Sequence, residues 1–324
     1  MNMNVVALSL ICCLPGVVSP QSGRQPKTIS LPTGVTVQYG MMSRAGTLAA
    51  TVGSDNVVHV WSIDSGELLQ NLADGGHPPM SVEFSPDGRL LAVAFQVVAN
   101  EKAVLRIFDV ASWKTEHEFI VPDVFAVAIS PDNRRIALSG MVTQIWDVEN
   151  SRILADISPP FGGSASLSFS GDSSGLATAD NDGHVRVFDA ATGKLRSTGP
   201  AFLLEPLAVA FTQDGKALIA GGVDKIVSII DPETGKVLRT LSSQPGLIMS
   251  LDVSADGRQV AVIYGDSDRF STVDHLMLWD VDTGTILANF QKRGITLLGG
   301  AFAGDHYRFA AVSDNQLSVW SLPW

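Results

Sequence analysis

The sequence is short of cysteine. Only Cys12 and Cys13 occur among its 324 residues, and both lie close to the N-terminus. If that segment is removed, the rest of the chain has no disulfide, no thiolate nucleophile and no cysteine-based metal site. Cysteine usage therefore does not indicate the compartment of the protein.

Positive charge is also scarce. The chain has 22 Lys and Arg against 33 Asp and Glu, which gives a formal net charge of −11. Binding to nucleic acid depends on neutralising phosphates with basic side chains, so the charge balance argues against a nucleic-acid partner. An acidic surface of this kind favours solubility.

One apolar run, Val5 to Val18, stands out at the N-terminus. It is short for a bilayer span and is interrupted by Pro15, so it predicts a signal peptide over residues 1–19 rather than a stable membrane span. A polar lead-in follows at 20–27. We therefore expect a periplasmic or secreted protein. The basic residue usual before such a run is missing, which leaves open an uncleaved anchor or a wrong start codon, and a cytoplasmic location if the run is not a signal.

Motifs for local chemistry are missing as well. The six histidines show no H-x-x-x-H or H-E-x-x-H spacing, and neither a G-x-S-x-G elbow nor a phosphate loop is present. Asp180-Asn181-Asp182-Gly183 resembles the start of a calcium loop but lacks the downstream glutamate, and Asp-Gly is common in hairpin turns. We predict no metal site, no cofactor and no catalytic residue.

What the sequence does contain is a repeat. Seven copies of a short apolar run, six of them with an aromatic at the centre, occur along the chain: VHVWSIDSGE from Val58, LRIFDVASWK from Leu105, TQIWDVENSR from Thr143, VRVFDAATGK from Val185, VSIIDPETGK from Val227, LMLWDVDTGT from Leu276 and LSVWSLPW from Leu317. A fixed period of about 40 residues indicates a repeat architecture.

Each copy has the same internal order of strands and turns. A first strand ends in a bulky apolar anchor, a turn such as Ser85-Pro86-Asp87-Gly88 follows, and then come a second strand, the aromatic-centred strand and a fourth strand. Four short antiparallel strands per unit are the blade of a β-propeller. The sequence predicts an all-β, seven-bladed propeller of four-stranded antiparallel blades over residues 28–324.

The central residues of the repeated run are predicted to fill the gaps between blades rather than to stack on a ligand. They are Trp61, Phe108, Trp146, Phe188, Ile230, Trp279 and Trp320.

The chain resembles the WD-repeat propeller family. The resemblance rests on Trp146-Asp147 and Trp279-Asp280, with Phe108-Asp109, Phe188-Asp189 and Ile230-Asp231 as variants. Family members usually have a Gly-His pair before each first strand, and here only Gly76-His77 matches. This departure from the family pattern predicts that the buried His/Ser/Asp/Trp hydrogen-bond network of the family is mostly absent here. Such a chain resembles a divergent, bacterial-type member of the family.

The resemblance also predicts how the ring closes. The last copy stops at Trp324 after its third strand, and Thr28 to Leu31 near the N-terminus provides a spare strand. A last blade completed by this N-terminal strand leaves no unpaired blade edge.

The copies differ mainly between their second and third strands. The distance from anchor to central residue is 24 residues in copy two and 26 in copy six, against 17 to 19 elsewhere. By analogy with the family, these loops lie on the usual binding face. They predict a partner-contact rim, listed as Asn100, Glu101, Lys102, Asp266, Asp268, Arg269 and Phe270. The alternative is neutral drift, because loop tips tolerate insertions.

Three functions remain open. The first is an exported, monomeric, non-catalytic scaffold that binds a protein or peptide on the loop face. The second is a propeller enzyme of the lactonase type with a site at the channel mouth, since such sites use side chains from several blades and have no local motif. The third is an envelope module that binds glycan. Converging Asp, His or Arg side chains at the channel would favour the enzyme.

Overall fold

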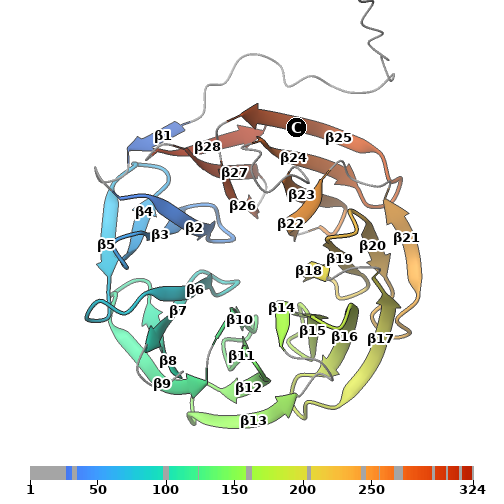
Figure 1. Ribbon diagram of the computed structural model, residues 1–324, viewed down its shortest axis with the longest axis horizontal. Helices are drawn as coiled ribbons and strands as arrows, with labels where there is room; N and C mark the ends of the chain where they lie inside the picture. Colours follow the sequence, from blue (N-terminus) through green and yellow to red (C-terminus); the bar gives the residue numbers. More distant parts are fainter. Residues whose placement is uncertain are drawn as a thin grey trace, which may run out of the picture.

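The computed structural model describes residues 27–30, 35–97, 102–122, 124–157, 163–202, 206–241, 246–254, 256–265, 273–293, 296–303, 306–313 and 316–322. Its strands form four-stranded antiparallel sheets arranged around a central axis, with one edge strand of each sheet innermost (Figure 1). The predicted signal peptide, 1–19, and most of the lead-in, 20–27, lie outside the described residues.

Blades 1 to 6 each use four consecutive strands. The first, innermost strands are β2 (Val37–Met42), β6 (Pro79–Phe84), β10 (Ala126–Ile129), β14 (Ser164–Phe169), β18 (Pro206–Phe211) and β22 (Leu247–Val253). The second strands are β3 (Leu48–Gly53), β7 (Leu90–Val97), β11 (Arg135–Ser139), β15 (Gly175–Asp180), β19 (Leu218–Gly222) and β23 (Gln259–Gly265).

The third strands contain the repeated aromatic-centred run, and the fourth strands form the outer wall. The third strands are β4 (Val58–Ser62), β8 (Lys102–Asp109), β12 (Thr143–Asp147), β16 (His184–Asp189), β20 (Val227–Ile230) and β24 (Val273–Asp280). The fourth strands are β5 (Leu68–Leu72), β9 (Thr115–Pro122), β13 (Arg152–Ile157), β17 (Leu195–Ala201), β21 (Val237–Leu241) and β25 (Ile286–Arg293).

The predicted count of seven blades needs a correction: six blades, not seven, are contiguous in the sequence. The remaining four-stranded sheet has the order β1-β28-β27-β26 and joins the two ends of the described chain. It contains β26 (Thr296–Ala303), β27 (His306–Ser313), β28 (Gln316–Leu322) and, as its outer strand, β1 (Lys27–Ser30). The strand expected at Thr28 to Leu31 is thus β1, which pairs antiparallel with β28 from Lys27↔Val319 to Ser30↔Gln316.

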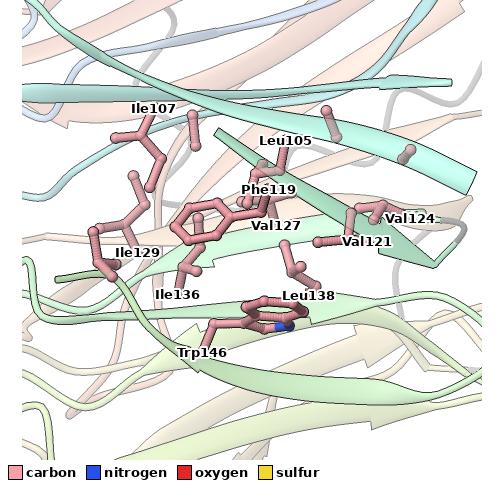
Figure 2. Close-up of a cluster of buried hydrophobic side chains, with 14 of the residues drawn as sticks. Leu105, Ile107, Phe119, Val121, Val124, Val127, Ile129, Ile136, Leu138 and Trp146 are labelled. Carbon is pink, nitrogen blue, oxygen red and sulfur yellow. The ribbon is translucent and has the colours of Figure 1, made fainter. Parts of the chain in front are cut away.

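The hydrophobic core lies between neighbouring blades. One cluster joins Leu105, Ile107 and Phe119 of blade 2 to Ile136 and Trp146 of blade 3 (Figure 2). The rings of Phe119 and Trp146 are 5.6 Å apart between centroids and tilted by 59°, the edge-on arrangement that aromatic pairs prefer. Blade 2 packs against blade 1 through a second cluster, so each of its two faces is buried against a neighbouring blade. This explains why both faces of its strands are apolar in the sequence.

The central residues of the third strands are buried, as predicted. Trp61, Phe108, Trp146, Phe188, Ile230 and Trp279 are all at most 9% exposed. The side chain of Trp320 lies outside the described residues.

The turns between first and second strands repeat one hydrogen-bond pattern. In blade 2, Ser85 Oγ donates to Asp87 Oδ1 at 2.6 Å and accepts the Leu90 N–H at 2.9 Å. The same Ser/Thr-x-Asp contact recurs at Ser130–Asp132, Ser170–Asp172, Thr212–Asp214 and Ser254–Asp256. The side chains therefore complete the turn, which is why the sequence conserves this pattern from one copy to the next.

The long segments between second and third strands in copies two and six are mostly strand rather than loop. In blade 2 the pairing of β7 with β8 continues to Val97↔Lys102, and in blade 6 that of β23 with β24 continues to Gly265↔Asp274. The extra residues lengthen the hairpins. Lys102 is therefore the first residue of a strand, which corrects its predicted place in a loop.

Candidate functional site

The two faces of the ring differ in what they present. We call the loop face the one with the turns between second and third strands and the connections from blade to blade. The turn face, at the other ends of the strands, has the Ser/Thr-x-Asp turns. Side-chain hydrogen bonds complete the Ser/Thr-x-Asp turns, so the turn face presents polar groups to a partner.

On the loop face, large apolar side chains are exposed where blade 2 leads into blade 3. Ile120 in β9 is 69% exposed, Phe125 just before β10 is 49% exposed, and Met141 is 70% exposed. The Phe125 N–H donates to Ser139 O at 2.6 Å, which places Phe125 beside the short turn that exposes Met141. The clipped third-copy turn thus has a structural consequence, because it leaves Met141 at its tip.

Lys102 lies at the same end of blade 2. It pairs with Pro122, and Val104 pairs with Ile120. Residues paired across antiparallel strands, and residues two apart along a strand, share one face of the sheet. Lys102 and Ile120 therefore point to the same side, which is the face of blade 2 opposite to the one that packs on blade 3 through Leu105 and Phe119. We call Phe125 and Met141 the blade 2–3 patch. Exposed apolar side chains that lie together are typical of protein interaction sites.

The other predicted rim residues cannot be placed. They lie outside the described residues and are Asn100, Glu101, Asp266, Asp268, Arg269 and Phe270. A shared sector between the long hairpins of blades 2 and 6 stays a prediction.

The central channel contains a cavity of about 370 Å³ near the turn face. Residues from the first strands of blades 1 to 6 and from the turns that follow them line it, including Arg44, Glu83, Ser168, Gln213 and Asp252. The cavity is therefore at the opposite end of the ring from the blade 2–3 patch.

Two carboxylates face this cavity from different blades. Glu83 is the penultimate residue of β6 and Asp252 that of β22. Burial in the channel, together with the negative charge of Asp252, raises the pKa of Glu83 to about 8. Within the described part of the chain, the Glu83 carboxylate accepts no hydrogen bond and forms no ion pair.

The sequence analysis did not single out these two acids, although their position just before the first-strand anchors distinguishes them from the other copies. In blades 1 to 6 the residue before each first-strand anchor lines the channel cavity, and these six positions read Met41, Glu83, Ala128, Ser168, Ala210 and Asp252. Two charges in an otherwise neutral column stand out once the copies are aligned by their anchors.

The blade 4 hairpin contains a buried ion cluster instead of a calcium site. Asp180-Asn181-Asp182-Gly183 forms the turn, closed by the Gly183 N–H donating to Asp180 O at 3.0 Å. Arg186 donates to Asp180 Oδ2 at 2.5 Å and to Asp182 Oδ2 at 2.6 Å. The guanidinium thus occupies the position beside these carboxylates that a cation would need, and its hydrogen bonds lower the pKa of Asp182.

This cluster also links blades 3 and 4. Ser164 Oγ donates to Asp180 Oδ1 at 2.7 Å and lies 3.1 Å from Thr143 Oγ1 in blade 3. The Ser164 N–H donates to Ser139 Oγ at 2.9 Å. The cluster is therefore a structural connection between blades.

The described residues contain only variants of the buried His/Ser/Asp/Trp hydrogen-bond network that is usual in WD-repeat propellers. In blade 1, Trp61 Nε1 donates to Thr51 Oγ1 at 3.0 Å, while the ring nitrogens of His59 lie 2.7 Å from Asn71 Oδ1 and 3.1 Å from Asp55 Oδ2. His77 of the Gly-His pair instead contacts Asp74 at 3.1 Å.

Other classes of site find no support in the part of the chain that the structure describes. No group of three or more His, Cys, Asp or Glu side chains is placed to hold a metal ion there. The same residues include no helix with the length and hydropathy needed to cross a membrane.

Comparison with known proteins identifies the repeat. Residues 162–189, which cover β14 to β16 of blade 4, match the family model "WD domain, G-beta repeat". Over 313 residues the chain is 25% identical to the Periodic tryptophan protein 2 homolog of Schizosaccharomyces pombe, covering 92% of this chain and 34% of that protein. It is 21% identical over 298 residues to Apoptotic protease-activating factor 1 of Rattus norvegicus, covering 89% and 22% of the two chains.

A plant relative aligns in the same way. Autophagy-related protein 16 of Arabidopsis thaliana is 21% identical over 280 residues, covering 84% of this chain and 52% of that protein. The chain thus spans between about a fifth and a half of the length of these curated relatives. Kinship with bacterial members stays a prediction.

Proposed function

Because the chain belongs to the WD-repeat β-propellers, we propose that it is a non-catalytic scaffold that binds a protein or peptide on its loop face. Relatives with WD repeats support a role in protein interaction. The finer proposal, the choice of face, rests on the blade 2–3 patch.

The observation in favour of that face is the exposure of Phe125 and Met141, which the hydrogen bond from the Phe125 N–H to Ser139 O brings to the same turn. Apolar side chains in contact with water become favourable contacts when a partner covers them. The other large exposed apolar residues include Leu69 and Leu238, which lie near the starts of fourth strands on the outer wall. The rigid ring beneath the patch keeps its side chains in place without a cost in loop ordering.

We also propose that the protein is exported and monomeric. The support for export is the apolar run from Val5 to Val18. N-terminal sequencing of the protein from its native cell tests this, because an intact Met1 would contradict cleavage.

The hydrolase alternative needs a nucleophile or an activated water with its base in one place. The described lining of the channel offers Glu83, Asp252 and Arg44, and it includes no His, Cys or Lys. No described feature favours the glycan-binding alternative.

Affinity capture from the native cell extract tests the scaffold proposal. We expect wild type to retain a protein that the double variant Phe125→Ser/Met141→Ser loses. The matched control is Leu69→Ser/Leu238→Ser, which removes exposed apolar side chains from the outer wall and should retain it. Loss in both doubles, or in neither, would contradict the assignment to the loop face. Alanine variants of Lys102, Arg269 and Phe270 test the predicted rim in the same assay.

A further inference from the structure

The first strands share an irregularity where they start, at the loop-face mouth of the central channel. In blades 1, 2, 4, 5 and 6 the pairing of the first strand with the second skips one residue there, which is a β-bulge. In blade 3, Phe125 holds the same position, immediately before the first paired residue of β10. A bulge leaves one residue outside the ladder and redirects its side chain, and bulges are frequent at the rims of barrels.

The six residues at this position occupy one place in the fold. Each lies four positions before the end of its first strand, at the loop-face end of the innermost strand of its blade (Figure 1). They therefore surround the mouth of the channel, and we call them the collar: Gln38, Met80, Phe125, Ala165, Leu207 and Met249. None of them lines the channel cavity, which lies toward the turn face.

The collar side chains are turned out of the blades. Met249 is 56% exposed and Phe125 is 49% exposed, and the other four are exposed or partly buried. The residue immediately before each collar residue is buried or partly buried, so the bulge is what turns this one position toward water. The backbone thus keeps apolar surface in contact with solvent at the same point of several blades.

Hydrogen bonds between neighbouring inner strands hold the collar in shape. Tyr39 Oη donates to Pro79 O at 3.1 Å, which ties β2 to β6 next to the collar residue of blade 2. Ser166 Oγ accepts the Val209 N–H at 3.3 Å, which ties β14 to β18 next to the collar residues of blades 4 and 5. A partner that binds here therefore meets a surface that needs little ordering.

The collar has no charge. Five of its six residues are apolar, and the sixth, Gln38, is neutral. The residue before each of them is uncharged as well. A charged side chain of a partner would lose water at this place without gaining an ionic partner, which is unfavourable. An aromatic or aliphatic side chain removes apolar collar surface from water and meets no such penalty.

We propose that the collar receives one uncharged apolar side chain, aromatic or long aliphatic, from the protein or peptide that binds the loop face. This rests on the proposed function, because Phe125 belongs both to the collar and to the blade 2–3 patch. A partner that covers Phe125 has the channel mouth beside it. Residues of several blades around one axis form the kind of rigid apolar socket that takes an anchor side chain at protein interfaces.

Methyl NMR of the full chain, with isotope-labelled methionine methyl groups, tests the collar. Met80 and Met249 report from two of its blades. We expect N-acetylphenylalaninamide to shift both signals, and the charged N-acetyllysinamide to shift neither. Met41 and Met42, which line the channel cavity, should not move. Shifts at Met41 and Met42 alone, or equal shifts with the lysine probe, would overturn the proposal.

A variant that fills the collar gives the second test. Ala165→Phe should weaken binding of N-acetylphenylalaninamide, and the backbone accepts the larger side chain because blade 3 has Phe125 at the same position. Ala111→Phe, at an exposed position in the turn between β8 and β9, is the matched control and should bind as wild type does. Met249→Ser should weaken binding about fivefold or more, as followed at Met80, because it removes apolar contact. Wild-type affinity in both collar variants would contradict the collar site.

Capture of the partner separates this proposal from the proposed function. Loss of the partner in Ala165→Phe as well as in Phe125→Ser/Met141→Ser supports insertion into the collar. Loss in the patch variant alone leaves the loop-face assignment standing and overturns insertion. Retention by the patch variant would contradict the proposed function, whereas the methyl shifts decide on the collar without it.

Discussion

At the scale of single residues, positions with positive φ show how adjacent blades are tied together. The first turn of most blades has glycine at this position, as at Gly88 and Gly215, but blades 3 and 4 have Asn133 and Ser173. Asn133 Nδ2 donates to Asp87 Oδ2 of blade 2 at 2.6 Å, and Ser173 Oγ accepts the Asp132 N–H of blade 3 at 3.1 Å. The strained residues thus gain a bond to the preceding blade that glycine could not make.

Replacing these residues by glycine tests that account. Asn133→Gly and Ser173→Gly should each be less favourable than the matched control by about 1 kcal/mol in the free energy of unfolding, the usual net contribution of one hydrogen bond, because relief of the positive φ acts at all three positions. Ser151→Gly is the matched control, because Ser151 also has positive φ (53°) but is exposed. It should be neutral or stabilising by up to about 1 kcal/mol, since glycine adopts this conformation without strain. Urea unfolding measures all three, and equal effects would contradict the bridging role.

The aspartates after the central residues predict an acid limit of stability. Asp189 accepts bonds from Arg196 and Thr192, which lower its pKa to about 2 from 3.8. The unfolded chain therefore binds this proton at higher pH than the folded chain, and the stabilisation, complete above about pH 4, is lost as the pH falls toward 2. Melting temperatures between pH 5 and 2 should fall less steeply for Asp189→Asn than for wild type. Parallel curves would contradict the assignment.

At the scale of elements, the closing strand β1 was predicted from the sequence, and it pairs antiparallel with β28. Ile29 is 3% exposed and packs with Trp61, Leu317 and Val319. The hairpin extensions of blades 2 and 6 were not foreseeable, since inserted residues can form either loop or longer strand. In blade 2 the pairing of β7 with β8 continues to Val97↔Lys102, so the inserted residues lengthen the strands.

Substitution in β1 tests the closure. Ile29→Asp should destabilise the protein by about 3 kcal/mol or more, because it buries an unpaired charge. Thr28→Asp, at the neighbouring exposed position, should have little effect. Deleting Pro26 to Pro32 should lower the melting temperature markedly, and an unchanged melting curve would contradict closure by β1.

The buried cluster of blade 4 makes a further prediction between elements. Asp180 is 1% exposed, so Asp180→Ala should leave the partly buried Arg186 with one partner fewer and cost about 3–5 kcal/mol. The exposed pair of Arg196 and Asp189 is the comparison, and Arg196→Ala should cost about 1 kcal/mol or less. Similar losses in urea unfolding would contradict the structural role of the cluster.

At the scale of the whole molecule, the repeat period predicts the propeller because each copy contains four strands with turn residues in fixed places. The functional positions were harder to predict. The exposure of Phe125 and Met141 depends on which side of the ring the short third-copy turn faces. The approach of Glu83 to Asp252 depends on closing a ring that brings together residues 169 positions apart. Neither property is local in the sequence.

The central claim is that a partner covers the loop face where blades 2 and 3 meet. Hydrogen exchange of the complex, formed with the protein captured by wild type, measures this most directly. We predict slower amide exchange in segments 120–126 and 139–143 when the partner is bound, with no change in the Ser/Thr-x-Asp turns of the opposite face. Slower exchange confined to those turns or to the outer strands would contradict the account.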